Sequence, residues 1–280
     1  MSTAVPDERN LAVTLDDGVG LVVLRRPEKL NALDAGLRRA LLAAMLGLGS
    51  NPSVRAVVLT GEGRSFCSGS DIDGLGRGDS RQVLLNEYRP LIEALRRLPK
   101  PVIAAVEGSA AGAGASLAFA CDLIVMGQEA RFDFGFIRLG LIPDAGVAWH
   151  LVRAIGRYRA AELLWSGGSV GSASAAAWGL VNRVVPAGQA REAALELAAD
   201  LAHGPATAIG TAKGLLDQAL TTDLSGSLVA EADAQARMRA TPDHAEAMAA
   251  WTSRRQAAVR DAGHPRVERS AAARGRGPIA

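Results

Sequence analysis

The sequence predicts an α/β core followed by a purely helical C-terminal region. Short apolar runs at 55–61, 101–106 and 123–126 are typical of buried strands, and segments with helical periodicity separate them. After Pro186 the strand pattern stops, and four alanine-rich helical segments follow at 187–203, 205–220, 224–240 and 242–259. Strands that alternate with helices, and then helices alone, indicate an α/β core with a helical appendage.

The elements can be followed along the chain from its N-terminal end. Residues 11–24 alternate and then become apolar around two glycines, as a β-hairpin does. Asp34 is in position to cap a helix over 35–48, and 80–98 is typical of a long amphipathic helix with a kink at Pro90. We therefore expect a flexible N-terminus at 1–10, a core at 11–200, a further helical region at 201–260 and a disordered tail at 261–280.

The composition excludes several classes of function. The 280 residues carry a net charge of +2, which does not indicate a broad basic surface for nucleic acid. Two cysteines, Cys67 and Cys121, cannot build a disulfide framework and fit a reducing cytoplasm, the expected location. No apolar run is long enough to cross a bilayer, so no membrane contact is expected. The four histidines are scattered, which predicts no metal site.

Two small-residue turns each follow a predicted strand. Gly108–Leu117 (GSAAGAGASL) leads into a helix, and Gly112 and Gly114 allow a ligand to approach the main chain closely. Ser65–Ile72 (SFCSGSDI) follows the preceding strand and also places small residues around a glycine. Backbone N–H groups at such turns lack partners and favour negative charge. Two such turns could direct two donors at one oxygen, as an oxyanion hole does, although a tight turn in a core is the simpler interpretation of each alone.

The chain resembles the crotonase family, the enoyl-CoA hydratase/isomerase superfamily, over roughly residues 10–260. The resemblance is carried, in order, by RPEKLNAL, VVLTGEGRSFCSGSDI, VIAAVEGSAAGAGASLAFACDL, FIRLGLIPDAGVAWHLVRAIG and GLVNRVV. It implies a core of stacked ββα spiral turns, a helical trimerisation region, and a homotrimer or a hexamer. It also implies an acyl-CoA substrate, no cofactor apart from the coenzyme A of that substrate, and an oxyanion held by the N–H groups of Ser70 and Ala113.

The sequence departs from the hydratases of that family at two positions. Where they carry glutamates, this chain has Ser116 and Phe136, neither of which exchanges a proton at neutral pH. Asp144 matches the aspartate of a subgroup of isomerases, and the surrounding segments resemble the phenylacetate-pathway isomerases most. The resemblance thus implies an isomerase that moves a double bond, or rearranges an epoxide, with Asp144 as acid and base. Without it, Asp144 after a proline would be interpreted as a turn residue.

Further residues are expected at the substrate. Phe136, Ile142 and Trp149 are apolar neighbours that could desolvate Asp144 and raise its pKa. In a trimer, Trp251 and Arg254 of the last helix could reach the coenzyme A of a neighbouring subunit. The alternative, a solvated helix end, suits Arg255 nearly as well as coenzyme A binding does, and it suits Arg254 less. The complete set of expected substrate and coenzyme A contacts is Arg26, Lys29, Leu30, Ser68, Gly69, Asp71, Ile72, Gly112, Phe136, Trp149, Trp251 and Arg254.

Three alternatives remain open. The chain could be a hydratase-like lyase of the same family, or a catalytically silent subunit that binds coenzyme A. A hydrolase built on Ser116 is the weakest, since no histidine lies near it in the sequence and the resemblance implies no such partner.

Overall fold

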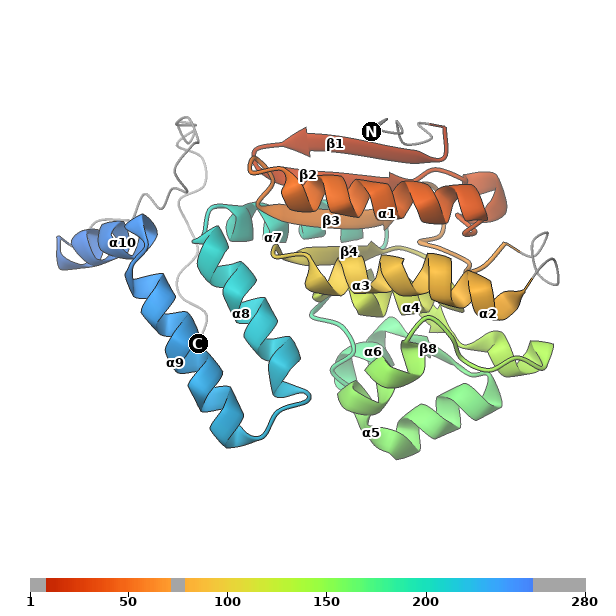
Figure 1. The fold of residues 1–280 in the computed structure, drawn as a ribbon. Helices are drawn as coiled ribbons and strands as arrows, with labels where there is room; N and C mark the ends of the chain where they lie inside the picture. The colour runs from red at the N-terminus through yellow and green to blue at the C-terminus, as the bar shows by residue number, and fades with distance from the viewer. Residues whose placement is uncertain (1–8, 72–78, 254–280) are drawn as a thin grey trace.

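A computed structural model describes residues 9–71 and 79–253 and centres on a six-stranded sheet in the order β1-β2-β3-β4-β6-β9 (Figure 1). β1 pairs antiparallel with β2, and every other neighbouring pair in this sheet is parallel. The strands are β1 (Leu11–Asp16), β2 (Val19–Leu24), β3 (Ala56–Gly61), β4 (Val102–Val106), β6 (Leu123–Gly127) and β9 (Arg183–Val185). The predicted hairpin and the predicted α/β core are confirmed.

A smaller sheet lies beside the large one and contains β5 (Ser109–Ala111), β7 (Arg131–Asp133) and β8 (Ser169–Gly171) in the order β5-β7-β8. A parallel bridge between Cys67 and Ala110 extends this sheet by the segment that follows β3. The chain therefore crosses from the large sheet to the small one three times, after β3, β4 and β6. Each crossing is followed by helical structure, so the core consists of stacked ββα turns, as the resemblance implied.

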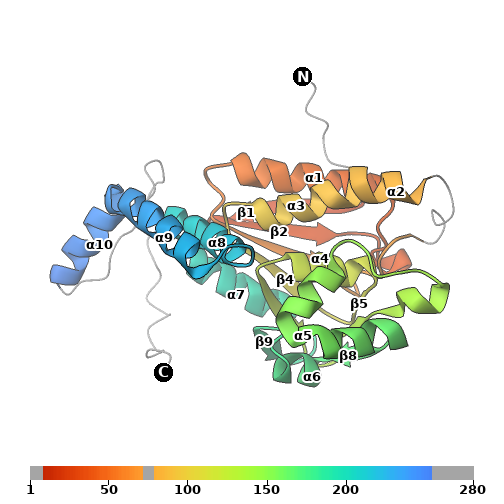
Figure 2. The same ribbon diagram turned by 60° about the horizontal axis from the view of Figure 1, so that its bottom comes forward.

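Helices cover the two faces of the large sheet (Figures 1 and 2). α1 (Ala35–Ser50) and α3 (Arg89–Arg97) lie over one face, and α7 (Ala190–Ala202) lies over the other. The Asp34 carboxylate caps α1 by accepting a hydrogen bond from the amide of Leu37 at 2.7 Å. Four buried alanines recur every fourth residue of α7, at 190, 194, 198 and 202. Because alanine is small, this stripe lets α7 pack closely against the strands.

The C-terminal helices α8 (Ala206–Ala219), α9 (Leu224–Arg239) and α10 (Pro242–Thr252) confirm the predicted helical region. Lys213 anchors α8 to the core, because its Nζ lies 2.8 Å from the Asp122 carboxylate and donates to the carbonyls of Leu95 and Lys100. α9 and α10 extend away from the sheets in both views. Within the described ranges, no helix has the length and apolar character needed to cross a bilayer.

Three boundaries differ from the predicted ones. The predicted helix at 80–98 is interrupted: α2 (Ser80–Val83) passes through a π-helical turn at Leu84–Tyr88 before α3 begins, so the irregularity precedes Pro90. The sequence predicts a helix over 157–166, but α5 (Val147–Ser166) begins ten residues earlier and contains a non-helical glycine, Gly156, at φ +76°. The sequence also predicts a last strand over 179–185, of which only Arg183–Val185 pairs in the sheet. The remaining helices are α4 (Ala113–Ala120) and α6 (Ser172–Ala177), with 3₁₀ turns at Pro27–Lys29 and Gly135–Leu139.

Candidate active site

The stacking of the spiral turns brings the two predicted turns side by side. Cys67 pairs with Ala110 of β5, so the residues that follow each of them lie next to one another. A Cβ added at Gly69 would lie 3.2 Å from the Ala113 nitrogen and 2.7 Å from the Ala111 carbonyl oxygen. Segments more than forty positions apart in the sequence therefore meet through backbone atoms.

The hydrogen bonds of the neighbouring carbonyls show which way the two amides point. The Gly69 carbonyl accepts a hydrogen bond from the Leu33 amide at 2.7 Å, and the Ser70 N–H belongs to the same peptide unit. In a trans peptide the C=O and N–H point in opposite directions, so the Ser70 N–H points away from Leu33. The Gly112 carbonyl accepts from the Ser116 amide at 3.2 Å within α4. The Ala113 N–H therefore points out of the N-terminal end of that helix.

Glycine is required at two positions of this arrangement. Gly69 has φ +96°, a region that side-chain-bearing residues rarely adopt, and this conformation sets the orientation of the Ser70 peptide. At Gly114 any Cβ would collide with the Cys67 carbonyl, so only glycine lets α4 approach the Cys67 backbone closely. The two glycines therefore bring the Ser70 and Ala113 amides close together.

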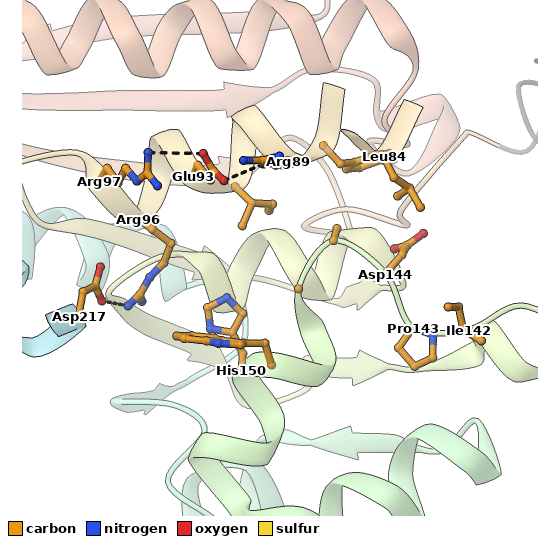
Figure 3. A pocket seen from close by; sticks show the side chains of 15 residues that line it. Leu84, Arg89, Glu93, Arg96, Arg97, Ile142, Pro143, Asp144, His150 and Asp217 are labelled. Carbon is orange, nitrogen blue, oxygen red and sulfur yellow. Dashed lines mark hydrogen bonds and ion pairs between the residues drawn. The ribbon is translucent and has the colours of Figure 1, made fainter. Parts of the chain in front are cut away.

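A cavity of about 720 Å³ opens beside α3 and the start of α5 (Figure 3). Apolar walls and charged groups contribute to it from three parts of the fold, namely the π turn with α3, the loop before α5 together with the first turn of α5, and α8. Its lining residues are Leu84, Tyr88, Arg89, Ile92, Glu93, Arg96, Arg97, Ile142, Pro143, Asp144, Ala145, Gly146, Trp149, His150 and Asp217. Of the predicted residues, Asp144, Ile142 and Trp149 line this cavity together.

Asp144 differs from the other two acidic residues of the cavity. Glu93 pairs with arginines and Asp217 pairs with Arg96, whereas the buried Oδ1 of Asp144 has no hydrogen-bond partner. Burial raises the pKa of Asp144 from its ordinary value of 3.8 to about 6, in the predicted direction. The next residue, Ala145, has φ +47°, a strained conformation for a residue with a side chain. Asp144 is thus a half-buried, unpaired carboxyl group on a strained turn.

Ser116 lies next to the Asp144 turn, and Phe136 lies next to Gly112. Ser116 is fully buried, and its hydroxyl donates to the backbone carbonyl of Asp144 at 3.0 Å. It therefore links α4, whose first amide is Ala113, to the Asp144 turn. Phe136 is 8% exposed, and its ring lies 3.8 Å from where a Cβ of Gly112 would be. It contributes an apolar surface beside the Gly112–Ala113 turn but does not line the cavity.

Tyr88 is a site residue that the sequence did not single out. Its hydroxyl and the Ser70 hydroxyl are 2.6 Å apart, and its ring lies under the Arg38 guanidinium at 4.9 Å. Burial raises the pKa of Tyr88, so it is protonated at neutral pH. Within an amphipathic helix a tyrosine resembles an ordinary core residue, and only the spiral packing brings it to Ser70.

The residues expected to contact coenzyme A form two groups. Leu30 and Ser68 lie against each other, since the Ser68 amide donates to the Leu30 carbonyl at 2.9 Å and the Ser68 hydroxyl donates to the Lys29 carbonyl. Arg26 is held by the protein itself, because its guanidinium pairs with Asp71 at 2.8 Å and donates to the Ala32 carbonyl. These contacts fix the Arg26–Asp71 region beside the Ser70 turn.

Three further expected contacts are Ile72, Trp251 and Arg254. Trp251 is 83% exposed on α10, which extends away from the core. Ile72 and Arg254 lie outside the described residues.

The cysteines and histidines provide no competing chemistry in the described part. Cys67 is buried, and burial raises the pKa of its thiol to about 12, so it is not a thiolate at neutral pH. Burial likewise raises the pKa of Cys121. Across the described ranges, no cluster of three or more His, Cys, Asp or Glu side chains could hold a metal ion. The Ser116 hydroxyl donates to backbone carbonyls and has no hydrogen bond to a histidine within the described residues, which disfavours the hydrolase alternative.

Comparisons with known proteins show similarity over most of the chain. The sequence model of the family described as Enoyl-CoA hydratase/isomerase matches residues 14–262. A Rhodobacter capsulatus protein named "Probable enoyl-CoA hydratase" is 39% identical over 243 residues, which cover 86% of this chain and 94% of the relative. The 1,2-epoxyphenylacetyl-CoA isomerase of Escherichia coli K12 is 35% identical over 247 residues, covering 86% and 94%. A crystal structure of an enoyl-CoA hydratase from Polaromonas sp. JS666 superposes with a TM-score of 0.84 at 36% identity, covering 88% and 98%.

Proposed function

The chain belongs to the enoyl-CoA hydratase/isomerase family, and on this basis we propose that it is an acyl-CoA isomerase. It moves a double bond in an enoyl-CoA thioester, or rearranges an epoxide in one, through an enolate. Asp144 is the single acid and base, and the Ser70 and Ala113 amides stabilise the oxyanion. The E. coli isomerase at 35% identity supports this subtype, while the hydratase names of other relatives support only the coarser assignment.

The first requirement is polarisation of the thioester carbonyl. Its oxygen would accept hydrogen bonds from the N–H groups of Ser70 and Ala113, which the spiral turns bring close together. Both donors belong to backbone held by other hydrogen bonds, so little reorganisation is needed as negative charge develops. Each such donor typically lowers the barrier by about 3–4 kcal/mol. The α-carbon becomes acidic because the electron pair left by its proton is delocalised onto this oxygen.

The second requirement is a base that also returns the proton. The ionised Asp144 would take a proton from the α-carbon of a 3-enoyl group, and the electron pair would spread over a dienolate. The same carboxyl group would then deliver the proton to the γ-carbon, which leaves the double bond between the α- and β-carbons. A pKa of about 6 suits both steps, because the group is a base at neutral pH and yet is readily protonated.

The observation that carries the proposal is the difference in ion pairing among the three cavity carboxylates. Of the three carboxyl groups that line the cavity, only that of Asp144 has no ion-pair partner, and its unpartnered oxygen is buried. Hydration needs a base for water and an acid for the α-carbon, and the two positions that would supply them hold Ser116 and Phe136. One carboxyl group is enough for a 1,3-proton shift.

Product analysis with purified protein tests the assignment. We expect 3-enoyl-CoA to become 2-enoyl-CoA, and Asp144→Asn to abolish this conversion while coenzyme A thioesters still bind. The control is Asp200→Asn, which makes the same chemical change at an exposed position of α7. Formation of a 3-hydroxyacyl product from 2-enoyl-CoA would instead support the hydratase alternative. Binding without any turnover would support the silent subunit.

We further propose that the chain assembles as a trimer or as a dimer of trimers, with α9 and α10 in contact with a neighbouring subunit. Support comes from exposed apolar side chains on these helices, among them Leu228, Val229, Met248 and Trp251. Sedimentation of the purified protein tests this assembly, and a monomer at micromolar concentration would refute it.

A further inference from the structure

The end of the cavity opposite Asp144 is polar. Figure 3 shows Asp144 on one side and Arg96, with Asp217, on the other, and His150 between them. Leu84, Ile92 and Ile142 supply apolar wall. We call Arg96, Trp149, His150 and Asp217 the polar end. A substrate whose reacting carbons lie at Asp144 would pass an apolar wall before its last atoms reach these side chains.

Two donors of the polar end are available. Arg96 makes one hydrogen bond within the described residues, from Nη2 to Asp217, so the other N–H groups of its guanidinium remain for a ligand. The His150 ring makes no hydrogen bond in the same part of the chain and stands edge-on to Trp149, with ring centroids 4.9 Å apart. An apolar acyl end would desolvate both side chains without replacing their hydrogen bonds to water.

The charge around the polar end is positive. Arg89, Arg96 and Arg97 line the cavity, and the guanidinium of Arg153 lies 4.0 Å from the centre of the Trp149 ring. The neighbouring carboxylates are Glu93 and Asp217, so cations outnumber anions here. Burial first, and then the nearby Arg96 and Arg153, lower the pKa of His150 to about 4. His150 is therefore neutral at pH 7, with one N–H to donate, in a positive potential that favours an anionic ligand.

We propose that the polar end binds the terminal carboxylate of a dicarboxylic acyl-CoA, with Arg96 and His150 as donors. The inference rests on one part of the proposed function, namely that this cavity binds the acyl group. The apolar walls suit the methylene groups of such a chain, and a guanidinium is the side chain best matched to a carboxylate. Tyr88, which ends the π turn next to Ser70, and Arg96 in α3 are eight residues apart along continuous helical structure, which corresponds to about 12 Å. The thioester site near Ser70 and the polar end at Arg96 would therefore be separated by about the length of one short acyl chain.

Calorimetric titration with unreactive saturated thioesters tests the proposal without requiring turnover. The ligands are adipyl-, suberyl- and sebacyl-CoA, each compared with hexanoyl-, octanoyl- or decanoyl-CoA of the same length. We expect the dicarboxylic thioester to bind more tightly at one length or more, by about 10- to 100-fold, as for one hydrogen bond to a charged group. Equal or weaker binding at every length overturns the proposal. Absence of isomerisation with intact binding preference would refute the proposed function instead.

Two variants locate the effect. Arg96→Gln and His150→Leu should each reduce the preference for the dicarboxylic thioester while binding of the monocarboxylic partner changes little. Arg39→Gln removes the same charge from an exposed position of α1 outside the cavity and should preserve the preference. Because Arg96 also pairs with Asp217, thermal unfolding checks that the Arg96→Gln protein is folded. His150→Leu breaks no hydrogen bond of the described chain and therefore tests the binding preference independently. Preference retained in both variants overturns the assignment.

Discussion

Replacing Asp144 with asparagine should abolish isomerisation and at the same time stabilise the protein above pH 6. The Asp144 carboxyl group is largely buried and one of its oxygens has no partner, so burial penalises the ionised form. Its pKa rises from 3.8 to about 6. At 1.36 kcal/mol per pKa unit, this rise corresponds to roughly 3 kcal/mol. Because the side chain is partly solvent-accessible, we expect about 2–3 kcal/mol.

The pH dependence of this effect follows from proton linkage. Below about pH 4 the group is protonated in both the folded and the unfolded chain, so ionisation contributes nothing. Between about pH 4 and pH 6 the unfolded chain loses the proton while the folded chain retains it, so the free energy of unfolding falls as the pH rises. Above about pH 6 both are ionised and the full penalty is present. An asparagine carries none of it.

Urea unfolding of the wild type and Asp144→Asn between about pH 3.5 and pH 8 measures this difference. We expect the stability advantage of the variant to grow by about 2–3 kcal/mol across the interval and then remain constant. In parallel, kcat/KM of the wild type should rise with an apparent pKa near 6 and then level off. Asp200→Asn, at an exposed site, should show neither effect. A pH-independent difference between wild type and variant would refute the burial argument.

Three further substitutions test other parts of the structure. Gly69→Ala should lower kcat by about 10²–10³, because a Cβ would lie 2.7 Å from the Ala111 carbonyl at φ +96° and displace the Ser70 amide; steady-state kinetics alongside thermal unfolding checks this, and normal kcat would contradict it. Ser116→Ala should lower kcat more than it changes KM and cost about 1 kcal/mol of stability, since the 3.0 Å hydrogen bond to the Asp144 carbonyl is lost. Steady-state kinetics and urea unfolding measure both effects, and an unchanged kcat would mean that the Asp144 turn keeps its conformation without this bond. Lys213→Met should destabilise the fold by about 2–3 kcal/mol, because the largely buried Asp122 carboxylate loses its ion-pair partner and keeps, among the described residues, only the Val102 amide as a donor. Chemical denaturation measures the loss, and wild-type stability would show that α8 does not depend on this pair.

Local patterns determined most of the elements correctly. The apolar runs at β3, β4 and β6, and Asp34 as a helix cap, depend on a few neighbouring residues, and all of them occur in the structure. The π turn at Leu84–Tyr88 and the early start of α5 were missed. Both lie beside tertiary features that local patterns do not contain: α5 follows the turn at Ala145, whose φ is +47°, and the π turn ends at Tyr88, whose hydroxyl contacts Ser70.

The sequence by itself determined the chemical groups of the site: two small-residue turns with free amides, one aspartate after a proline, and no glutamate at Ser116 or Phe136. Tertiary structure alone decided that these groups meet. The Cys67–Ala110 bridge aligns the two turns, the Ser116 hydroxyl ties α4 to the Asp144 turn, and α8 carries Asp217 to Arg96. The physical reason is that an amide direction or a raised pKa depends on the burial and hydrogen bonds around a group, and distant segments provide both.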